Sequence, residues 1–392
     1  MAMKYVNAKD ALPEELLSVI QRYYQGGYLY IPKKSRGGTR PQTDYKIELE
    51  KRNQYIYLKY LEGRTKKELG NIYHLSESVI RRIIAKERVN YQKMKEIIEQ
   101  LLPLWGMGNG EILQIYHSAW EVNHAYVIKV YEDRKQLERN IRISEILSEC
   151  GIPVAKTVPT EAGEKYAAYE NRYFLLSEKL KGNNLSDLKD KTMAWKMGRA
   201  MAGLHMAFVK CERETEVLDN SLLKEMKGWI YENLENGGWK ILKKEEYTKA
   251  VERLESIYDD LPVQLIHRDV HFGNFLFHEG DLSGYIDFDL SQRNIRIFDI
   301  CYFLTGLLSE ETDDAFTRDE WMENIKSVIT GYESITEFSN GEKKAIPCVM
   351  ECIEILFVAY YIGMKDIRHA NDAYKEFRFI QNCENDVEKC IM

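Results

Sequence analysis

The first hundred residues alternate short apolar stretches with polar turns, a pattern typical of small helices. Residues 12–25 have helical spacing. They are followed by a short apolar stretch over 28–31 and by a basic, glycine-rich loop over 33–41. A further helix is expected to end at Glu62 and Gly63, because glycine often follows the last turn of a helix.

Two more helices follow, and each is preceded by a residue that can cap it. Thr65 is expected to cap a helix over 66–73, and Ser76 a helix over 77–86, because their hydroxyl oxygens can accept hydrogen bonds from unpaired backbone N–H groups. Two short helices joined by a three-residue turn are a helix-turn-helix. Its small or apolar interior positions are Leu69, Gly70, Leu75, Ile80 and Ile83.

The second helix of this pair carries side chains that suit DNA. Serine and arginine can meet base edges and phosphates in a major groove, and lysines can neutralise flanking phosphates. The candidate DNA-binding residues are Ser76, Ser78, Arg81 and Arg82, with Lys66, Lys67 and Lys86 beside phosphates.

The segment 28–84 resembles the DNA-binding part of the Mor transcription activators of phage. The similarity is carried by the stretch 30–33, by Arg52 and Asn53, and by the pair of capped helices. It implies an all-α helix-turn-helix domain over 1–90 that binds duplex DNA. The alternative is a three-helix appendage whose arginines are merely solvated.

From Leu101 onward the pattern changes to alternating apolar residues around a glycine-rich stretch, which predicts strand, glycine loop, strand. Gly106, Gly108 and Gly110 would let backbone N–H groups approach a triphosphate. Lys129, in a strand over 126–130, would point its ammonium group at the phosphates. The pattern also predicts a helix over 134–150, a strand over 173–180 and a linker at Gly182.

Composition and charge divide the chain in the same place. The 392 residues are 30% charged and 44% apolar, which fits two or three folded domains and excludes a disordered or collagen-like chain. The net charge is -7, but residues 1–100 carry +8 and residues 101–392 carry -15. A basic head on an acidic body indicates two functions.

The cysteines and the N-terminus favour a cytoplasmic protein. Seven scattered cysteines without a C-x-x-C pair indicate neither a zinc site nor a disulfide framework. No signal peptide is expected over 1–20. The longest apolar stretch, 346–364, contains Glu351 and Glu354, so it is predicted to be a buried helix and no membrane contact is expected.

The strongest chemical signal is the run 265–274, which reads Leu-Ile-His-Arg-Asp-Val-His-Phe-Gly-Asn, followed by Asp287 at the end of a strand. Phosphoryl transfer needs a carboxylate that accepts the proton of the attacking hydroxyl, and oxygen ligands for Mg²⁺. Asp269 is the candidate base, and Asn274 with Asp287 can hold the metal.

In this order the pieces resemble the aminoglycoside phosphotransferase and choline kinase superfamily over about residues 101–392. The matching pieces are the glycine stretch, Lys129, the segment 151–154, the stretch 177–180, the helix segment 197–205, the run 267–274, Asp287 and Asp299. The resemblance implies an α+β, bilobal protein-kinase-like fold, with a small β-rich N-lobe over 91–181 and a helical C-lobe over 182–392.

The resemblance also implies roles for individual residues. ATP would lie between the lobes with its adenine against the backbone of Glu178 and Leu180, and Asp269 would be the base. His267 and Asp299 would be structural. The helix glutamate that should pair with Lys129 is missing, since Asn140 stands at its expected place. The candidates for that pairing are Glu138 and Glu145.

Protein kinases share the run His-Arg-Asp but differ elsewhere. His271 stands where they place a catalytic-loop lysine, Asp289 replaces the glycine of Asp-Phe-Gly, and no Ala-Pro-Glu follows. A small-molecule acceptor is therefore favoured over a protein.

Three functions fit these observations. The first is an ATP- and Mg²⁺-dependent kinase of a small alcohol, such as an aminoglycoside, choline, homoserine or a sugar, fused to a DNA-binding head that dimerises on DNA. The second is a transcription regulator whose kinase-like domain only senses a nucleotide or metabolite. The third is an antibiotic-resistance enzyme. Glu351 and Glu354 would either receive a cationic substrate or form salt bridges.

Overall fold

The structure, a computed structural model, describes residues 44–391 except 109, 185–189 and 309–316, and the side chains from residue 49 onward. The helix expected over 12–25, the apolar stretch 28–31 and the basic loop 33–41 lie outside the described residues. By internal contacts, the described residues from Asp44 onward form one compact unit.

The N-terminal helices of this unit are α3 (Asp44–Leu61), α4 (Lys66–Ile72) and α5 (Glu77–Leu101). Thr65 caps α4 through a capping box with Glu68, and Ser76 caps α5, as predicted. A Cβ at Gly70 would lie 2.8 Å from the carbonyl oxygen of Leu75, so glycine is needed there for the close approach of the turn.

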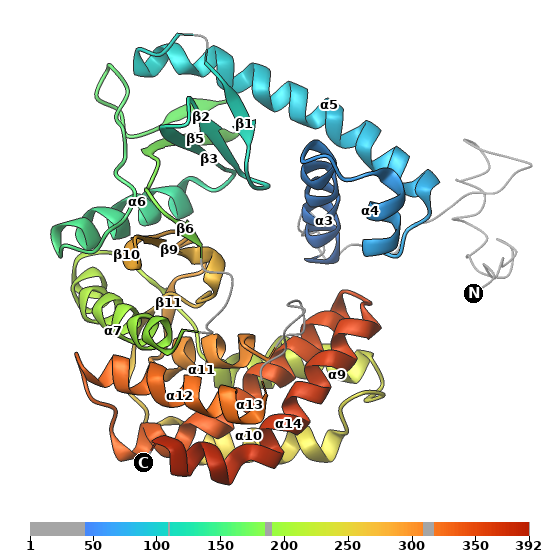
Figure 1. The fold of residues 1–392 in the computed structure, drawn as a ribbon, viewed down its shortest axis with the longest axis vertical. Helices are drawn as coiled ribbons and strands as arrows, with labels where there is room; N and C mark the ends of the chain where they lie inside the picture. Colours follow the sequence, from blue (N-terminus) through green and yellow to red (C-terminus); the bar gives the residue numbers. More distant parts are fainter. Residues whose placement is uncertain (1–43, 109, 185–189, 309–316, 392) are drawn as a thin grey trace, which may run out of the picture. The chain divides into compact units, whose positions relative to one another are not determined.

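The prediction that the helix after Ser76 ends near residue 86 is wrong. Helix α5 continues without a break to Leu101, so the expected domain boundary between 90 and 91 falls inside it (Figure 1). Its first half buries Ile80, Ile83 and Ile84 against α3 and α4, and its last turns belong to the core of the next domain.

One side chain, Tyr91, packs against both of these apolar clusters. Its ring centroid lies 5.7 Å from that of Tyr57 on α3 and 4.9 Å from that of Trp120 in the following sheet. Tyr91 therefore connects the helical cluster to the sheet through side-chain packing.

A five-stranded antiparallel sheet of order β1-β2-β3-β5-β4 follows α5 and a short 3-10 helix, Leu102–Trp105. Lys129 on β3 is paired with Ala119 on β2 and with Leu175 on β5. The strands are β1 (Ile112–Gln114), β2 (Ala119–Val122), β3 (Tyr126–Tyr131), β4 (Ala167–Tyr169) and β5 (Arg172–Glu178), with helix α6 (Arg134–Glu149) between β3 and β4. β3, β5 and α6 agree with the strands over 126–130 and 173–180 and with the helix over 134–150 that were predicted, whereas the stretch from Leu101 to Trp105 is helical and not a strand.

The rest of the chain is largely helical, with two small three-stranded sheets of order β10-β9-β6 and β7-β11-β8. The strands are β6 (Asn183–Asn184), β7 (Leu218–Asp219), β8 (Val263–Ile266), β9 (Phe275–His278), β10 (Asp281–Tyr285) and β11 (Gln292–Ile295). The helices are α7 (Lys191–Glu214), α8 (Leu222–Glu225), a π-helical turn (Met226–Ile230), α9 (Tyr231–Asn236), α10 (Lys244–Tyr258), a 3-10 turn (Phe272–Asn274), α11 (Ile297–Gly306), α12 (Arg318–Glu333), α13 (Asn340–Gly363) and α14 (Ile367–Ile391).

Helix α13 forms the centre of this helical region and packs against α10, α11 and α14. Among the described residues, α13 alone is long and apolar enough to cross a membrane, but 78% of its most apolar window is buried inside the protein. A core helix of a globular domain meets the same length and composition criteria, so this is weak evidence for a membrane span.

Candidate active site

The loop that carries Asp269 begins at the end of β8 and is fixed by a buried carboxylate. Asp299, in the first turn of α11, accepts hydrogen bonds from the backbone N–H groups of His267 and Arg268, each at 2.8 Å. It also contacts the imidazole of His205 at 3.0 Å. Arg268 has a φ of 75°, so these two bonds hold the chain through a left-handed turn.

His267 lies beneath this loop and is fully buried. Its Nε2 lies 3.1 Å from the carbonyl oxygen of Ile286, which joins the loop to the strand end that carries Asp287. Asp299 and His267 thus both bond to backbone groups on either side of the proposed site.

The carboxylate of Asp269 is held from several sides. The hydroxyl of Tyr302 donates to Oδ1 at 3.1 Å, and the amide nitrogen of Asn274 donates to Oδ2 at 3.1 Å. The Nε2 atom of His271 is 3.5 Å from Oδ2. Burial acts to raise the pKa of Asp269, but the interactions with His271, His267 and Tyr302 outweigh it and lower the pKa to about 2. Asp269 is therefore ionised at neutral pH.

Asn274 is 5% exposed, and its amide nitrogen is used twice, since it also donates to the carbonyl oxygen of Asp269 at 2.9 Å. Both bonds use the nitrogen, which turns the amide oxygen away from Asp269. An amide oxygen and nearby carboxylates are the hard oxygen ligands that Mg²⁺ and Ca²⁺ prefer, so the residues present fit a divalent cation.

Asp287 follows β10 with a φ of 64° and points its side chain at Lys129. The Lys129 ammonium nitrogen is 2.9 Å from Oδ1 of Asp287 and 2.8 Å from Oδ2 of Asp289. Burial lowers the pKa of Lys129, but the charges of Tyr131, Asp287 and Asp289 outweigh this effect and raise the pKa above its usual value. Lys129 is therefore a fixed positive charge beside the expected metal ligands.

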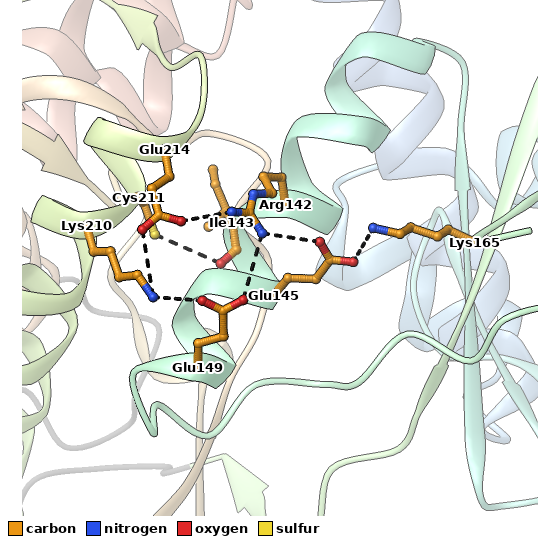
Figure 2. A network of polar contacts seen from close by, with 8 residues as sticks. All are labelled: Arg142, Ile143, Glu145, Glu149, Lys165, Lys210, Cys211 and Glu214. Atoms are coloured by element: carbon orange, nitrogen blue, oxygen red, sulfur yellow. Dashed lines mark hydrogen bonds and ion pairs between the residues drawn. The ribbon is translucent and has the colours of Figure 1, made fainter.

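The two carboxylates that were expected to pair with Lys129 are turned elsewhere, and both predictions are wrong. Glu138 accepts hydrogen bonds from Arg134 at 2.8 Å and from Tyr166 at 3.0 Å. Glu145 belongs to a separate surface network on α6, shown in Figure 2, where it pairs with Lys165 and lies 3.7 Å from Arg142. The same figure shows Glu149 and Glu214 completing that network with Lys210.

The order strand, glycine loop, strand is also wrong. Gly106 has a φ of 66° and ends the 3-10 helix before β1, where a Cβ would lie 2.6 Å from the carboxylate of Glu161. The turn next to Lys129 is instead 115–118, between β1 and β2, and the carbonyl oxygen of Ser118 accepts the N–H of Val130 at 2.8 Å. Gly108 and Gly110 both precede β1 as well.

The linker expected to face adenine leaves the sheet at the end of β5. The N–H of Glu178 is bonded to the carbonyl oxygen of Lys156 at 2.9 Å, and the N–H of Lys179 to that of Ala125 at 2.8 Å. Leu180 lies against Gly284 on β10, where a Cβ would approach the leucine side chain to 2.6 Å. The linker thus contacts both the five-stranded sheet region and strand β10 of the helical region.

Two residues near Asp269 and Lys129 were missed by the sequence reasoning. Asp289 stands two residues after Asp287. This close spacing of two carboxylates in the sequence could have indicated that both belong to the site. Tyr302 stands one helical turn after Asp299 in α11, and no local pattern marks it.

The remaining candidates lie away from this site. Ser78, Arg81 and Arg82 on α5 are exposed, as is Ser76, which caps this helix; Arg81 pairs with Glu77 at 2.7 Å. Glu351 contacts Arg253 at 3.4 Å. Of the two alternatives for Glu351, a cationic substrate or a salt bridge, the structure has the salt bridge. Glu354 is buried beside Glu376 and Thr305, and burial together with the charge of Glu376 raises its pKa.

The comparisons with known proteins agree with this geometry. The model of the phosphotransferase enzyme family matches residues 110–338, more than half of the chain. The chain belongs to this family. It is a small-molecule kinase, as predicted.

Individual relatives of this phosphotransferase are distant. A homoserine kinase of Gluconobacter oxydans is 23% identical over 244 residues, which cover 59% of this chain and 73% of the relative. An amicoumacin kinase solved with AMP-PNP and Ca²⁺ superposes with a TM-score of 0.57 at 17% identity, over 77% of this chain and 96% of that one. This likeness shows the kinase-like fold, which confirms the fold predicted for the body.

A third relative is of another kind. The uncharacterised protein YraL of Bacillus subtilis is 38% identical over 90 residues, which are 21% of this chain but 97% of YraL. A segment of this phosphotransferase therefore resembles nearly the whole of a separate short chain.

Proposed function

We propose that this phosphotransferase moves the γ-phosphoryl group of ATP, in the presence of Mg²⁺, to the hydroxyl group of a small alcohol. The observation that carries the proposal is the placement of four side chains: Asn274 bonds to Asp269 in the loop after β8, and Lys129, within β3, contacts Asp287 just after β10. Phosphoryl transfer requires such a set: a base for the acceptor, oxygen ligands for the metal, and a cation for the phosphates.

Asp269 is suited to orient the acceptor. Its pKa of about 2 keeps it ionised, so it can accept the hydrogen bond of an acceptor hydroxyl while Tyr302 and Asn274 hold the carboxylate still. A carboxylate with so low a pKa is a weak base for an intact alcohol. We propose that it takes the proton only as the oxygen bonds to phosphorus, when the hydroxyl has become acidic.

Asn274 and Asp287 would hold the metal, which when bound neutralises charge on the phosphates. Lys129 would contribute a further positive charge from β3. The turn 115–118 lies beside Lys129, with the N–H groups of Ile115 and Tyr116 bonded to the carbonyl oxygen of Ala119, and we propose that this turn covers the phosphates in place of the glycine stretch.

The alcohol is drawn from the classes already considered: an aminoglycoside, choline, homoserine or a sugar. The homoserine kinase relatives favour an amino alcohol among them. The test is to measure ADP formation by the full chain against a panel of such alcohols, with Asp269→Asn as the control. Turnover of one alcohol by the parent and not by Asp269→Asn is expected. Equal turnover by both would refute the role of Asp269.

We further propose that the N-terminal helices bind duplex DNA. The support is a pair of capped helices with exposed Arg81 and Arg82, and a net charge of +8 over residues 1–100.

A further inference from the structure

Lys129 contacts two carboxylates, but only one of them is free to stay with it. Its ammonium nitrogen lies 2.9 Å from Asp287 and 2.8 Å from Asp289. In the proposed site Asp287 is a ligand of Mg²⁺, and a divalent cation competes strongly with an ammonium group for the charge of the same carboxylate. Asp289 is then the carboxylate that remains to orient Lys129.

Asp289 is itself held by helix α6. Its Oδ1 accepts a hydrogen bond from the amide nitrogen of Asn140, while its Oδ2 faces Lys129. Asn140 is 5% exposed and also lies 3.4 Å from the hydroxyl of Tyr131. A single carboxylate thus connects α6 to β3, with one oxygen for each.

The identity of residue 140 follows from this arrangement. Asn140 stands where a helix glutamate was expected to pair with Lys129, and an amide can donate a hydrogen bond to Asp289. A glutamate there would place a second negative charge against Asp289, which is unfavourable unless the two share a proton. The carboxylate that pairs with Lys129 therefore belongs to Asp289, in the segment after β10. Helix α6 supplies an uncharged hydrogen-bond donor, Asn140.

We propose that Asp289 is the anionic partner that orients Lys129 toward the nucleotide phosphates, and that Asn140 positions Asp289. This inference rests on the proposed use of ATP and Mg²⁺. Asp289 is a positioning residue, since it acts through Lys129. Because Lys129 belongs to the five-stranded sheet and Asp289 to the helical region, the ion pair also joins these two parts of the kinase fold.

The first test is to titrate the full chain with AMP-PNP by calorimetry at several MgCl2 concentrations. Asp289→Asn keeps the shape of the side chain and removes its charge. We expect AMP-PNP affinity to fall by about tenfold or more, because a charge-assisted contact to Lys129 is lost. The MgCl2 concentration for half-maximal binding should not change. Unchanged affinity, or a raised MgCl2 requirement as for a metal ligand, would overturn the proposal.

A second variant restores the charge from the helix. Asn140→Glu combined with Asp289→Asn places a carboxylate on α6, and we expect it to recover a large part of the lost affinity. A double variant that binds AMP-PNP no better than Asp289→Asn would contradict the role of the charge. Glu149→Gln is the matched control, because it removes a carboxylate of α6 that lies in the separate network of Figure 2. Its affinity should equal that of the parent.

These measurements need no acceptor alcohol, so they do not depend on finding the substrate. A parent chain that bound no AMP-PNP with MgCl2 would refute the proposed function as well. Equal binding by the parent and by Asp289→Asn would refute only the assignment of Asp289.

Discussion

The hydroxyl of Tyr302 donates a hydrogen bond to Oδ1 of Asp269 at 3.1 Å, from the second turn of α11 to the loop after β8. Burial raises the pKa of Tyr302, and the charge of Asp269 raises it further, so the phenol stays protonated and remains a donor. Tyr302 and Asn274 hold one carboxylate oxygen each. These two bonds restrict the direction from which Asp269 can accept a hydrogen bond from the hydroxyl group of the alcohol.

Tyr302→Phe should lower kcat by about tenfold, because it removes one hydrogen bond to a charged group and leaves the aromatic packing in place. The KM for ATP should not change, since Tyr302 contacts the base and not the lysine. Steady-state kinetics on the identified alcohol will measure both constants. Tyr374→Phe, whose hydroxyl contacts Glu246 at 3.1 Å, is the control and should match the parent. An unaltered kcat in Tyr302→Phe would contradict the proposal that Tyr302 orients the carboxylate of Asp269.

Asn274→Ala and Asp287→Ala should raise the MgCl2 concentration needed for nucleotide binding by about tenfold or more, because each removes an oxygen ligand from a hard cation. Lys129→Ala should weaken AMP-PNP binding at saturating MgCl2 without changing the metal requirement. Calorimetric titrations at several MgCl2 concentrations separate the two effects. Identical titrations for the parent and the Asn274 and Asp287 variants would contradict the metal site.

The sequence predicted this site well where the chemistry is local. Asp269 and Asn274 stand five residues apart in one loop, and Asp287 ends the next hairpin, so a short motif contains all three. The partner of Lys129 could not be found in this way, because Asp289 is 160 residues away and only the fold brings it close. The expectation of a helix glutamate directed attention to Glu138 and Glu145, which face other charges.

Two errors in the fold have simple physical reasons. Gly106 was interpreted as part of a phosphate loop, but a glycine with positive φ is equally suited to end a helix. The length of α5 was underestimated although a signal was present. Tyr91, Met94, Ile98 and Leu101 continue the three- and four-residue spacing of the earlier part of the helix.

Glu351 should make the protein less stable as the pH rises. Burial raises its pKa to about 7 although Arg253 and Gln381 act to lower it, whereas the unfolded chain has the usual value of 4.5. Between these values the folded state binds more protons than the unfolded state. The free energy of unfolding therefore falls from about pH 4.5 to about pH 7 through this group.

Glu351→Gln should remove that contribution. We expect its Tm to exceed that of the parent by a few degrees at pH 8, with a smaller difference at pH 5. Differential scanning calorimetry at the two pH values will measure the effect, with Glu149→Gln as a surface control. A difference that does not depend on pH would show that Glu351 is ionised throughout the range.

The full chain should bind duplex DNA with an affinity that falls steeply as salt rises, because its basic side chains would displace condensed counterions. Arg81→Ala with Arg82→Ala should reduce the slope of log affinity against log salt by up to about two. Arg213→Ala removes an exposed arginine from α7 and should leave the slope unchanged. The full chain is needed because a fragment ending at residue 90 would cut α5.

If the DNA-binding proposal holds, the full chain is expected to dimerise on a two-fold symmetric site, which sedimentation with and without DNA will measure. Any coupling between the two functions must be reciprocal, so DNA should change AMP-PNP affinity by the same factor by which AMP-PNP changes DNA affinity. If the full chain showed no salt-dependent binding of duplex DNA, the DNA-binding proposal would be refuted.

The position of Tyr91 on α5 also determines how the protein should melt. Its ring belongs to two apolar clusters, one with Tyr57 and one with Trp120, and the helix between them has no interruption. Unfolding of either cluster would expose apolar side chains of the other to water. The unfolding of one cluster therefore destabilises the other. Residues 44–391 should accordingly lose their structure in one cooperative calorimetric transition, and Tyr91→Ala should divide it into two.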